Sequence, residues 1–305
     1  MFSERIGREV ERHIPLADLS HFKIGGYSDY FFEASNILEI EKAVGLVREC
    51  SVPYYVIGGG YNILFSDEGY KGLLIKNAVT GLRRRGKSVV EAFSGTSIDG
   101  IIRFCTAQGL GGLEFMAGIP GTLGGAVYGN AGAFDKDIGM KVDRALVLGE
   151  NGKARSVSRS FLEFGYRSSR LKRKHDILIS ADIKIHEQPS DRTQILIEDI
   201  LDKRKTRHPP WGVACAGSYF KNPVLPSGKK VAAAELLDRV GSKKLFVGDA
   251  AVYGSHANFI INKGQACAKD VLLLASEMKK RVRKRFGVEL EEEVVFLPAD
   301  FSMFR

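Results

Sequence analysis

The run from Gly118 to Gly132, GIPGTLGGAVYGNAG, constrains the fold of this chain more than any other segment. It combines glycines, a proline and small polar residues without a helical or strand period, so we do not expect it to pack a core of its own. Glycine permits positive φ and lacks a β-carbon, which lets amide N–H groups converge on a ligand at short range. Such main-chain donors bind phosphate or pyrophosphate. A lone GxxG would indicate an ordinary turn, but a run of this length predicts a cradle for a phosphate-bearing cofactor.

The size and composition of the chain are those of a globular protein with several compact units. It has 305 residues, of which 44% are hydrophobic and 27% charged, so we expect two or three domains. The start, MFSERIGREVERHIP, is charged and lacks the apolar core of a secretory signal. No apolar run reaches the length of a membrane span. We therefore expect a cytoplasmic protein that does not enter a membrane.

Cysteine and histidine residues give no sign of a metal site. The cysteines Cys50, Cys105, Cys215 and Cys267 are scattered, without a CxxC pair. The six histidines are equally dispersed and form neither HxxxH nor HExxH. We therefore predict reduced thiols and no bound metal.

The net charge of +9 leaves two classes of partner open. A basic surface suits nucleic acid, but the basic clusters lie far apart and lack interleaved aromatic residues for stacking bases. The same surplus suits an enzyme whose ligands carry phosphates and carboxylates, because a positive field concentrates anions. Charge alone does not separate the two.

Hydrophobic patterning divides the chain into three parts. The first part is a small α/β unit with strands at 29–33, 54–57 and 72–75 and a helix that starts after a cap at Ser35 or Asn36. The second is α+β, with strands at 89–93, 145–148 and 177–185 around a helix near 97–108. In its last strand apolar and polar residues alternate, which predicts a half-buried strand. The third part holds helices at 231–240 and 270–286, and Gly287 ends the second of these.

A second glycine segment, Gly58-Gly59-Gly60-Tyr61-Asn62-Ile63, follows the strand at 54–57. It fails the dinucleotide fingerprint, because Ile63 stands where the third glycine is needed and no acid lies about twenty residues on. No GK[ST] follows either loop, so a P-loop nucleotidase has even less support than a dinucleotide fold. Two separated cradles suit one long dinucleotide such as FAD, lying between two small domains.

Eight segments in order resemble a known family. They are FKIGG (22–26), GGGYNIL (58–64), LEFMAGIPGT (113–122), NAGAF (130–134), YRSS (166–169), GSYFKNP (217–223), HANFIIN (256–262) and LEEEV (290–294). Together they span nearly the whole chain. They resemble the UDP-N-acetylenolpyruvoylglucosamine reductases (UDP-N-acetylmuramate dehydrogenases), which belong to the vanillyl-alcohol oxidase-type FAD-binding superfamily. The HANF form and the short C-terminal region are similar to the second subtype, which lacks an extra substrate loop bearing a tyrosine.

The resemblance implies an α+β fold in which a two-part FAD-binding module carries a third, substrate-binding α+β domain. The first FAD-binding subdomain would comprise residues 1–78, joined by the C-terminal segment 288–305. The second would comprise residues 79–205, and the substrate-binding domain residues 206–287.

The activity implied is reduction of the enolpyruvyl ether of UDP-N-acetylglucosamine enolpyruvate to UDP-N-acetylmuramate, in bacterial peptidoglycan precursor synthesis. NADPH would supply the electrons through non-covalent FAD, since neither glycine loop holds a histidine for a covalent link. The partner would be this small molecule, with no nucleic acid and no membrane, and the protein a monomer. The alternatives are another FAD-dependent oxidoreductase of the superfamily and a basic nucleic-acid-binding protein.

The resemblance also implies site residues. For catalysis they are Ser218 as proton donor, Arg167 as the cation beside the substrate carboxylate, and Glu293, which would need a raised pKa to act as a hydrogen-bond donor there. Those for FAD are Gly58, Gly59, Gly60, Tyr61, Asn62, Ile63, Gly118, Ile119, Pro120, Gly121, Thr122, Gly124, Gly125, Asn130 and Gly132. Those for the UDP-sugar are Lys221, Asn222, His256 and Asn258.

Three of these assignments carry reservations. Family members usually have serine where Tyr61 stands, so the contact of its side chain with the pyrophosphate is in doubt, although its backbone donor remains. For His256 and Asn258 a purely structural role is equally open.

Overall fold

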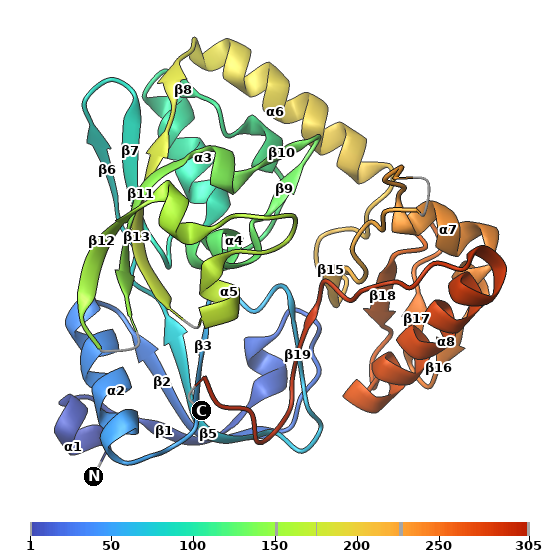
Figure 1. Ribbon diagram of the computed structural model, residues 1–305, viewed down its shortest axis with the longest axis horizontal. Coiled ribbons are helices and arrows are strands. Elements are labelled where there is room, and N and C mark those ends of the chain that lie inside the picture. Colours follow the sequence, from blue (N-terminus) through green and yellow to red (C-terminus); the bar gives the residue numbers. More distant parts are fainter. Residues whose placement is uncertain (1, 150–151, 175, 226–227, 304–305) are drawn as a thin grey trace.

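The computed structural model describes residues 2–149, 152–174, 176–225 and 228–303. Three sheets of four or five strands organise them, together with three buried apolar clusters. In Figure 1 the first two sheets lie close together, and the third stands to one side beyond the long helix α6 (Ser190–Lys205). Helices accompany the strands in each part, which agrees with the predicted α+β class.

The first sheet comes from the N-terminal residues and has the order β1-β2-β5-β3. Its strands are β1 (Glu11–Pro15), β2 (Tyr27–Ala34), β5 (Tyr70–Asn77) and β3 (Tyr54–Ile57). β1 is antiparallel to β2, whereas β2, β5 and β3 run parallel. Helix α2 (Ile37–Glu49) connects β2 to β3, and its predicted cap is confirmed, since the Asn36 side chain accepts a hydrogen bond from the Glu39 amide. The first part is therefore the expected βαβ unit, with the short helix α1 (Phe2–Ile6) in front of it.

The second sheet is antiparallel and has the order β12-β11-β13-β7-β6. Its strands are β12 (Ala154–Ser158), β11 (Val142–Leu148), β13 (Ile177–Lys184), β7 (Val89–Phe93) and β6 (Leu82–Arg85). Its helices are α3 (Ile98–Ala107), α4 (Leu123–Gly129), α5 (Arg170–Lys174) and α6. Two short pairs complete this part, β8 (Leu110–Gly111) with β14 (His186–Glu187) and β9 (Gly132–Ala133) with β10 (Lys136–Asp137).

Strand β13 corrects the prediction of a half-buried strand. Its residues from Ile177 to Ala181 are all buried. Ile177 and Ile179 pack in the first apolar cluster, whereas Leu178 and Ala181 pack in the second. In a regular strand Ala181 would share a face with Ile177 and Ile179, but the pairing with β11 shifts register between Leu178 and Ser180. The strand therefore passes from one core to the other, and the predicted alternation of buried and open positions holds only at its end, where Ile183 is buried and Lys184 exposed.

Helix α4 corrects the prediction that the glycine run has no helical period. Thr122 caps its start, and Asn130 ends it in the left-handed region with a φ of 46°. Leu123, Ala126 and Val127 are buried in the second cluster. They recur at i, i+3 and i+4, the spacing of one helix face. The surrounding glycines obscured this spacing in the sequence.

The third sheet has the order β15-β18-β17-β16. Its strands are β15 (Cys215–Ser218), β18 (Phe259–Asn262), β17 (Ala250–Val252) and β16 (Phe246–Val247). Helices α7 (Ala233–Arg239) and α8 (Ala268–Phe286) pack with it, and Gly287 caps α8 with a φ of 67°, as predicted.

Two segments tie the third sheet to the first. Phe22, Ile24 and Leu64, from the first part of the chain, are buried in the third apolar cluster. The C-terminal strand β19 (Val295–Leu297) returns to run parallel to β4 (Ile63–Phe65), directly after the first glycine loop. No helix among the described residues is both long enough and apolar enough to cross a membrane.

Candidate active site

The two glycine loops face each other. A β-carbon placed on Gly58 would lie 2.5 Å from Oγ1 of Thr122, and one on Gly59 would lie 3.7 Å from Cα of Gly121. Gly58 follows directly on β3, so this strand positions the first loop next to the second. The loops approach so closely only because these positions lack side chains.

Backbone donors gather where the loops meet. No hydrogen bond within the described chain uses the amide N–H groups of Gly59, Gly60 or Tyr61 in the first loop, or of Gly121 or Thr122 in the second. Amide donors without an internal partner need one from outside the chain. Two facing sets of such donors suit the pyrophosphate of a dinucleotide, so this arrangement fits the predicted FAD cradle.

Several predicted cofactor residues also hold the loops in place. Ile63 is buried in β4, Ile119 packs against the second cluster, and the Gly124 amide donates to the Ser94 carbonyl at 2.8 Å. The Gly125 amide donates a hydrogen bond to Oγ1 of Thr122 at 3.4 Å.

Asn130 and Gly132 lie away from the junction of the loops and contact the segment that carries Arg167. The Asn130 side chain is 2% exposed; it donates to the Gly165 carbonyl at 2.8 Å and accepts from the Gly139 amide at 3.0 Å. The carbonyl of Gly132 accepts from Nη2 of Arg167 at 2.9 Å. These contacts show that both residues brace the segment of Arg167, and their contact with the cofactor stays a prediction.

Arg167 is held in a backbone conformation that few side chains adopt. Its φ is +52°, in the left-handed region, and such strain is often kept at functional sites. Its Nε lies 2.6 Å from Oε1 of Glu293, and both side chains are only about a fifth exposed. A half-buried guanidinium is thus fixed beside a half-buried carboxyl group.

Glu293 is the point at which the three parts of the chain meet. Its carbonyl accepts from the Asn62 side chain in the first glycine loop at 3.2 Å, and its amide donates to the Tyr219 carbonyl in the third part at 2.8 Å. Its carboxylate faces Arg167 in the second part. Burial raises the pKa of Glu293, and the nearby Arg167 charge offsets this only in part. The direction agrees with the predicted shift.

Ser218 lies at the end of β15, one residue before Tyr219 and paired with Phe259 across the sheet. The preceding Gly217 has a φ of +75°, which favours glycine. Within the described residues no hydrogen bond engages the Ser218 hydroxyl, and the residue is partly exposed. The hydroxyl is therefore available to a ligand on the edge of the third sheet that faces Glu293.

Lysine side chains surround the carboxyl group of Glu293. Lys221 forms an ion pair with Glu291, and its side chain is only 15% exposed. Lys172, on α5, is close enough to Lys221 that this second cation, after burial itself, lowers the pKa of Lys172. Three cations thus lie near two carboxyl groups, an excess of positive charge that suits an anionic substrate.

Asn222 and Asn258, two further predicted substrate residues, both form hydrogen bonds within the protein. Asn222 donates its amide N–H to the hydroxyl of Tyr166 at 3.2 Å, and its side-chain oxygen accepts from Ala233 at the start of α7. Asn258 is 2% exposed, and its side chain donates to and accepts from the backbone of Phe220. For Asn258 the contacts therefore favour the structural role.

His256 lies beside Asn258 and shares its partly structural character. Its Nδ1 accepts from the Asn258 amide at 3.3 Å, and its ring meets His208 edge to face. Burial lowers its pKa, so the ring is held neutral.

Three residues near the site escaped the sequence analysis: Tyr166, Lys172 and Arg204. Tyr166 touches Asn222, and the Lys230 ammonium lies 3.5 Å from the centre of its ring. Arg204 lies against Gly118, and within the described chain its Nε and Nη2 have no hydrogen-bond partner. The one signal for Arg204 and Lys172 in the sequence is their place in the basic clusters 203–205 and 170–174, and such a cluster does not tell a buried cation from a solvated one.

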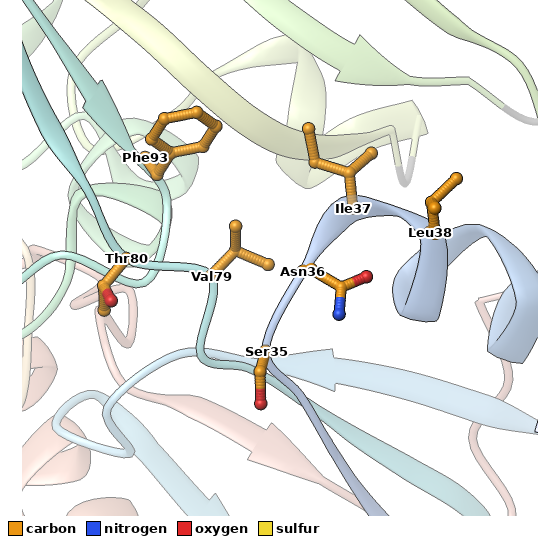
Figure 2. Close-up of a pocket in the computed structure, with 7 residues that line it drawn as sticks. All are labelled: Ser35, Asn36, Ile37, Leu38, Val79, Thr80 and Phe93. Carbon is orange, nitrogen blue, oxygen red and sulfur yellow. The ribbon is translucent and has the colours of Figure 1, made fainter. Parts of the chain in front are cut away.

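A cavity of about 400 Å³ lies elsewhere, between the start of α2 and the turn that follows β5. Figure 2 shows Ile37, Val79 and Phe93 extending toward one another there. Its lining residues carry no titratable group, and none belongs to the glycine loops or to the Glu293 region. It has no evident part in the chemistry of the site.

Comparisons with known proteins agree with this geometry. Residues 28–158 match the FAD binding domain family, and residues 209–297 match the family described as UDP-N-acetylenolpyruvoylglucosamine reductase, C-terminal domain. The chain thus contains an FAD-binding domain.

Curated relatives and a solved structure extend the match to almost the whole chain. The UDP-N-acetylenolpyruvoylglucosamine reductase of Caldicellulosiruptor saccharolyticus is 36% identical, over 96% of this chain and 94% of the relative. That of Clostridium botulinum strain Eklund 17B is 33% identical over the same shares. The crystal structure of the Thermus caldophilus reductase is 31% identical, with a TM-score of 0.79 over 95% of this chain and 99% of that chain. The chain therefore belongs to the UDP-N-acetylenolpyruvoylglucosamine reductase family.

Proposed function

We propose that this protein reduces the enolpyruvyl ether of UDP-N-acetylglucosamine enolpyruvate to UDP-N-acetylmuramate, with NADPH as reductant and bound FAD as carrier. The observation that carries the proposal is the position of Glu293. It joins the first glycine loop, through Asn62, to Arg167 and to the strand end beside Ser218. Glu293 thus connects the first glycine loop to Arg167, which suits an anionic substrate, and to the strand that carries Ser218, which can donate a proton.

The backbone of Gly59, Gly60, Tyr61, Gly121 and Thr122 would hold the FAD pyrophosphate, since their amides have no partner within the described chain. Bound FAD supplies a two-electron carrier that accepts hydride from NADPH and returns it to the enolpyruvyl double bond. The chain's own groups then supply placement, charge and a proton.

Arg167 and Glu293 would hold the substrate carboxylate. As hydride reaches the terminal vinyl carbon, negative charge develops on the adjacent carbon and its carboxylate. The guanidinium of Arg167 stabilises this charge. Burial raises the pKa of Glu293, which favours proton uptake, and a protonated Glu293 would donate a hydrogen bond to the substrate carboxylate rather than repel it.

Ser218 would donate the proton. A hydroxyl is a weak acid, but a carbanion-like carbon is a strong base, so the transfer is feasible when the two are in contact. The proton from Ser218 and the hydride together saturate the double bond.

The ligands would be divided among the three parts of the chain. Residues 1–78 with 288–305 and residues 79–205 hold FAD, and residues 206–287 hold the UDP-sugar, with Lys221 and Asn222 as contacts and His256 and Asn258 shaping their surroundings. The protein acts as a monomer in the bacterial cytoplasm, without nucleic acid or membrane.

The experiment that tests these roles separates the two half-reactions in Ser218→Ala. Reduction of the bound flavin by NADPH should stay near the wild-type rate, because it needs no proton from Ser218. Reoxidation by UDP-N-acetylglucosamine enolpyruvate should slow by about a hundredfold or more, the usual contribution of a positioned general acid. Stopped-flow absorbance of the flavin measures both rates without oxygen.

The matched control is Ser156→Ala on the exposed edge strand β12, which should leave both rates unchanged. Equal slowing of both half-reactions in Ser218→Ala would mean that Ser218 is structural.

A further inference from the structure

Three aromatic rings gather beside the first glycine loop: His21, Tyr61 and Trp211, here called the aromatic cluster. The ring centres of His21 and Tyr61 are 5.1 Å apart, those of His21 and Trp211 6.0 Å, and those of Tyr61 and Trp211 6.4 Å. The roles proposed above use the backbone of Tyr61 but none of these side chains.

His21 fixes the cluster between the first glycine loop and the third sheet. Its amide donates to the carbonyl of Gly60 at 3.0 Å, and its Nδ1 lies 3.0 Å from the carbonyl oxygen of Cys215, on β15. The ring is therefore anchored from both sides, and it holds the cluster at the point where the cofactor loop meets the substrate-binding part.

The Tyr61 ring lies over the junction of the two loops. A β-carbon on Gly59 would be 2.8 Å from Cε2 of this ring, and one on Gly121 would be 3.9 Å from Cδ2. The ring thus lies directly next to the amide donors assigned to a pyrophosphate.

Trp211 presents an indole to solvent. It is 77% exposed, although so large an apolar side chain is normally mostly buried. Its plane is tilted by 37° from that of Tyr61. The two ring centres lie 6.4 Å apart, and His21 lies close to both rings. A planar ring stacked between Tyr61 and Trp211 therefore needs the exposed indole to turn away from the cluster, to about 7 Å from Tyr61.

We propose that Tyr61 and Trp211 form a stacking site for the adenine ring of a dinucleotide. Aromatic side chains bind nucleic-acid bases by stacking, because every base has a π-face. FAD and NADPH both carry adenine, and either can bring it there. The inference rests on the proposed function only in that these are the two dinucleotides of the enzyme.

Trp211 is the single tryptophan of the sequence, so tryptophan fluorescence reports on this site alone. In the first arm, FAD is titrated into the apoprotein while tryptophan emission is recorded. In the second, NADP⁺, which cannot reduce the flavin, is titrated into the holoenzyme. Quenching in either arm shows that the dinucleotide binds within energy-transfer range of Trp211. The site is assigned to the dinucleotide whose affinity the variants below weaken.

Variants test whether stacking contributes to affinity. Tyr61→Ala and Trp211→Ala should each raise the Kd of the assigned dinucleotide by about tenfold, the effect of losing one stacked aromatic ring. Flavin fluorescence reports Kd in the FAD arm and difference absorbance of the flavin in the NADP⁺ arm. Tyr61→Phe keeps the ring and should bind as the wild type does. Phe246→Ala, which removes an aromatic side chain that is 69% exposed on β16, is the matched control.

The proposal is overturned if both alanine variants bind FAD and NADP⁺ with wild-type affinity, or if only UDP affinity changes, which would make the site one for uracil. Either result leaves the proposed function standing. A protein that binds no FAD at all would contradict the proposed function itself.

Discussion

Asn130 has a structural role inside the glycine run. Its left-handed backbone ends α4, and its buried amide joins Gly139 to Gly165. Gly165 lies two residues before Arg167, whose own φ is +52°. The strain at Arg167 is therefore supported by a hydrogen-bonded brace inside the glycine run.

Replacing Asn130 should reveal both parts of this role in the stability of the protein. Asn130→Ala should lower the free energy of unfolding by about 2–4 kcal/mol, because two buried backbone groups lose their partners and alanine resists positive φ. Asn130→Gly loses the same hydrogen bonds without the backbone strain, so it should cost about 1 kcal/mol less. Chemical denaturation of the apoprotein measures both free energies of unfolding. Equal losses in the two variants would show that the left-handed backbone at position 130 does not strain alanine.

At this scale the sequence predicted local roles better than distant contacts. The cap at Asn36, the stop at Gly287 and the raised pKa of Glu293 followed from neighbours in sequence or from charge next to charge. Arg204 and Lys172 were missed because their burial depends on segments far away in the chain, such as Gly118 and Lys221. A basic residue looks the same in sequence whether it faces solvent or a site.

At the scale of elements, the two glycine loops act as one unit because their backbones touch. The contact of Gly58 with Thr122 leaves no room for a side chain. The sequence indicated both loops and their common ligand. It did not predict helix α4 inside the second loop, because only three apolar residues carry the helical period and glycines surround them.

The contact between the loops predicts a loss of FAD affinity in Gly58→Ala. The new methyl group would meet Oγ1 of Thr122 at 2.5 Å and force the loops apart. We expect the Kd of FAD to rise by about tenfold or more, since several amide donors move together. Titration of the apoprotein with FAD, followed by flavin fluorescence, measures it.

Gly45→Ala is the control for this variant. Gly45 lies within α2, and an added β-carbon there meets no atom within 4 Å. Alanine should raise stability by up to about 1 kcal/mol and leave FAD affinity unchanged. If Gly58→Ala bound FAD as tightly as Gly45→Ala does, the contact would not shape the cradle.

At the scale of the whole molecule, three cores meet around the site without being independent. Strand β13 serves two of them, Leu64 joins the third from the first part, and β19 pairs with β4. The sequence predicted three parts and the α+β class. It could not predict these crossings, because each depends on pairing between residues far apart in the chain.

Two half-buried histidines, His208 after α6 and His256 before β18, make this assembly sensitive to acid. Burial, with help from the Arg204 charge, lowers the pKa of His208 from 6.5 to about 4, and burial also lowers the pKa of His256. Between these two values the unfolded chain binds more protons than the folded one. Stability should therefore fall as the pH drops from about 6.5 to about 4, by at most about 1.4 kcal/mol per pH unit for His208.

Thermal unfolding across this pH range tests the prediction. His208→Gln, which cannot take up a proton, should flatten the slope, and the same change at exposed His186 is the control. An unchanged slope in His208→Gln would show that His208 does not couple folding to pH.

The most direct test of the central claim is anaerobic mixing of the NADPH-reduced protein with UDP-N-acetylglucosamine enolpyruvate. The flavin absorbance should return in one turnover as UDP-N-acetylmuramate forms, and UDP-N-acetylglucosamine, which lacks the double bond, should leave the flavin reduced. A flavin that stays reduced with the enolpyruvyl compound would contradict the account and favour another oxidoreductase of the superfamily.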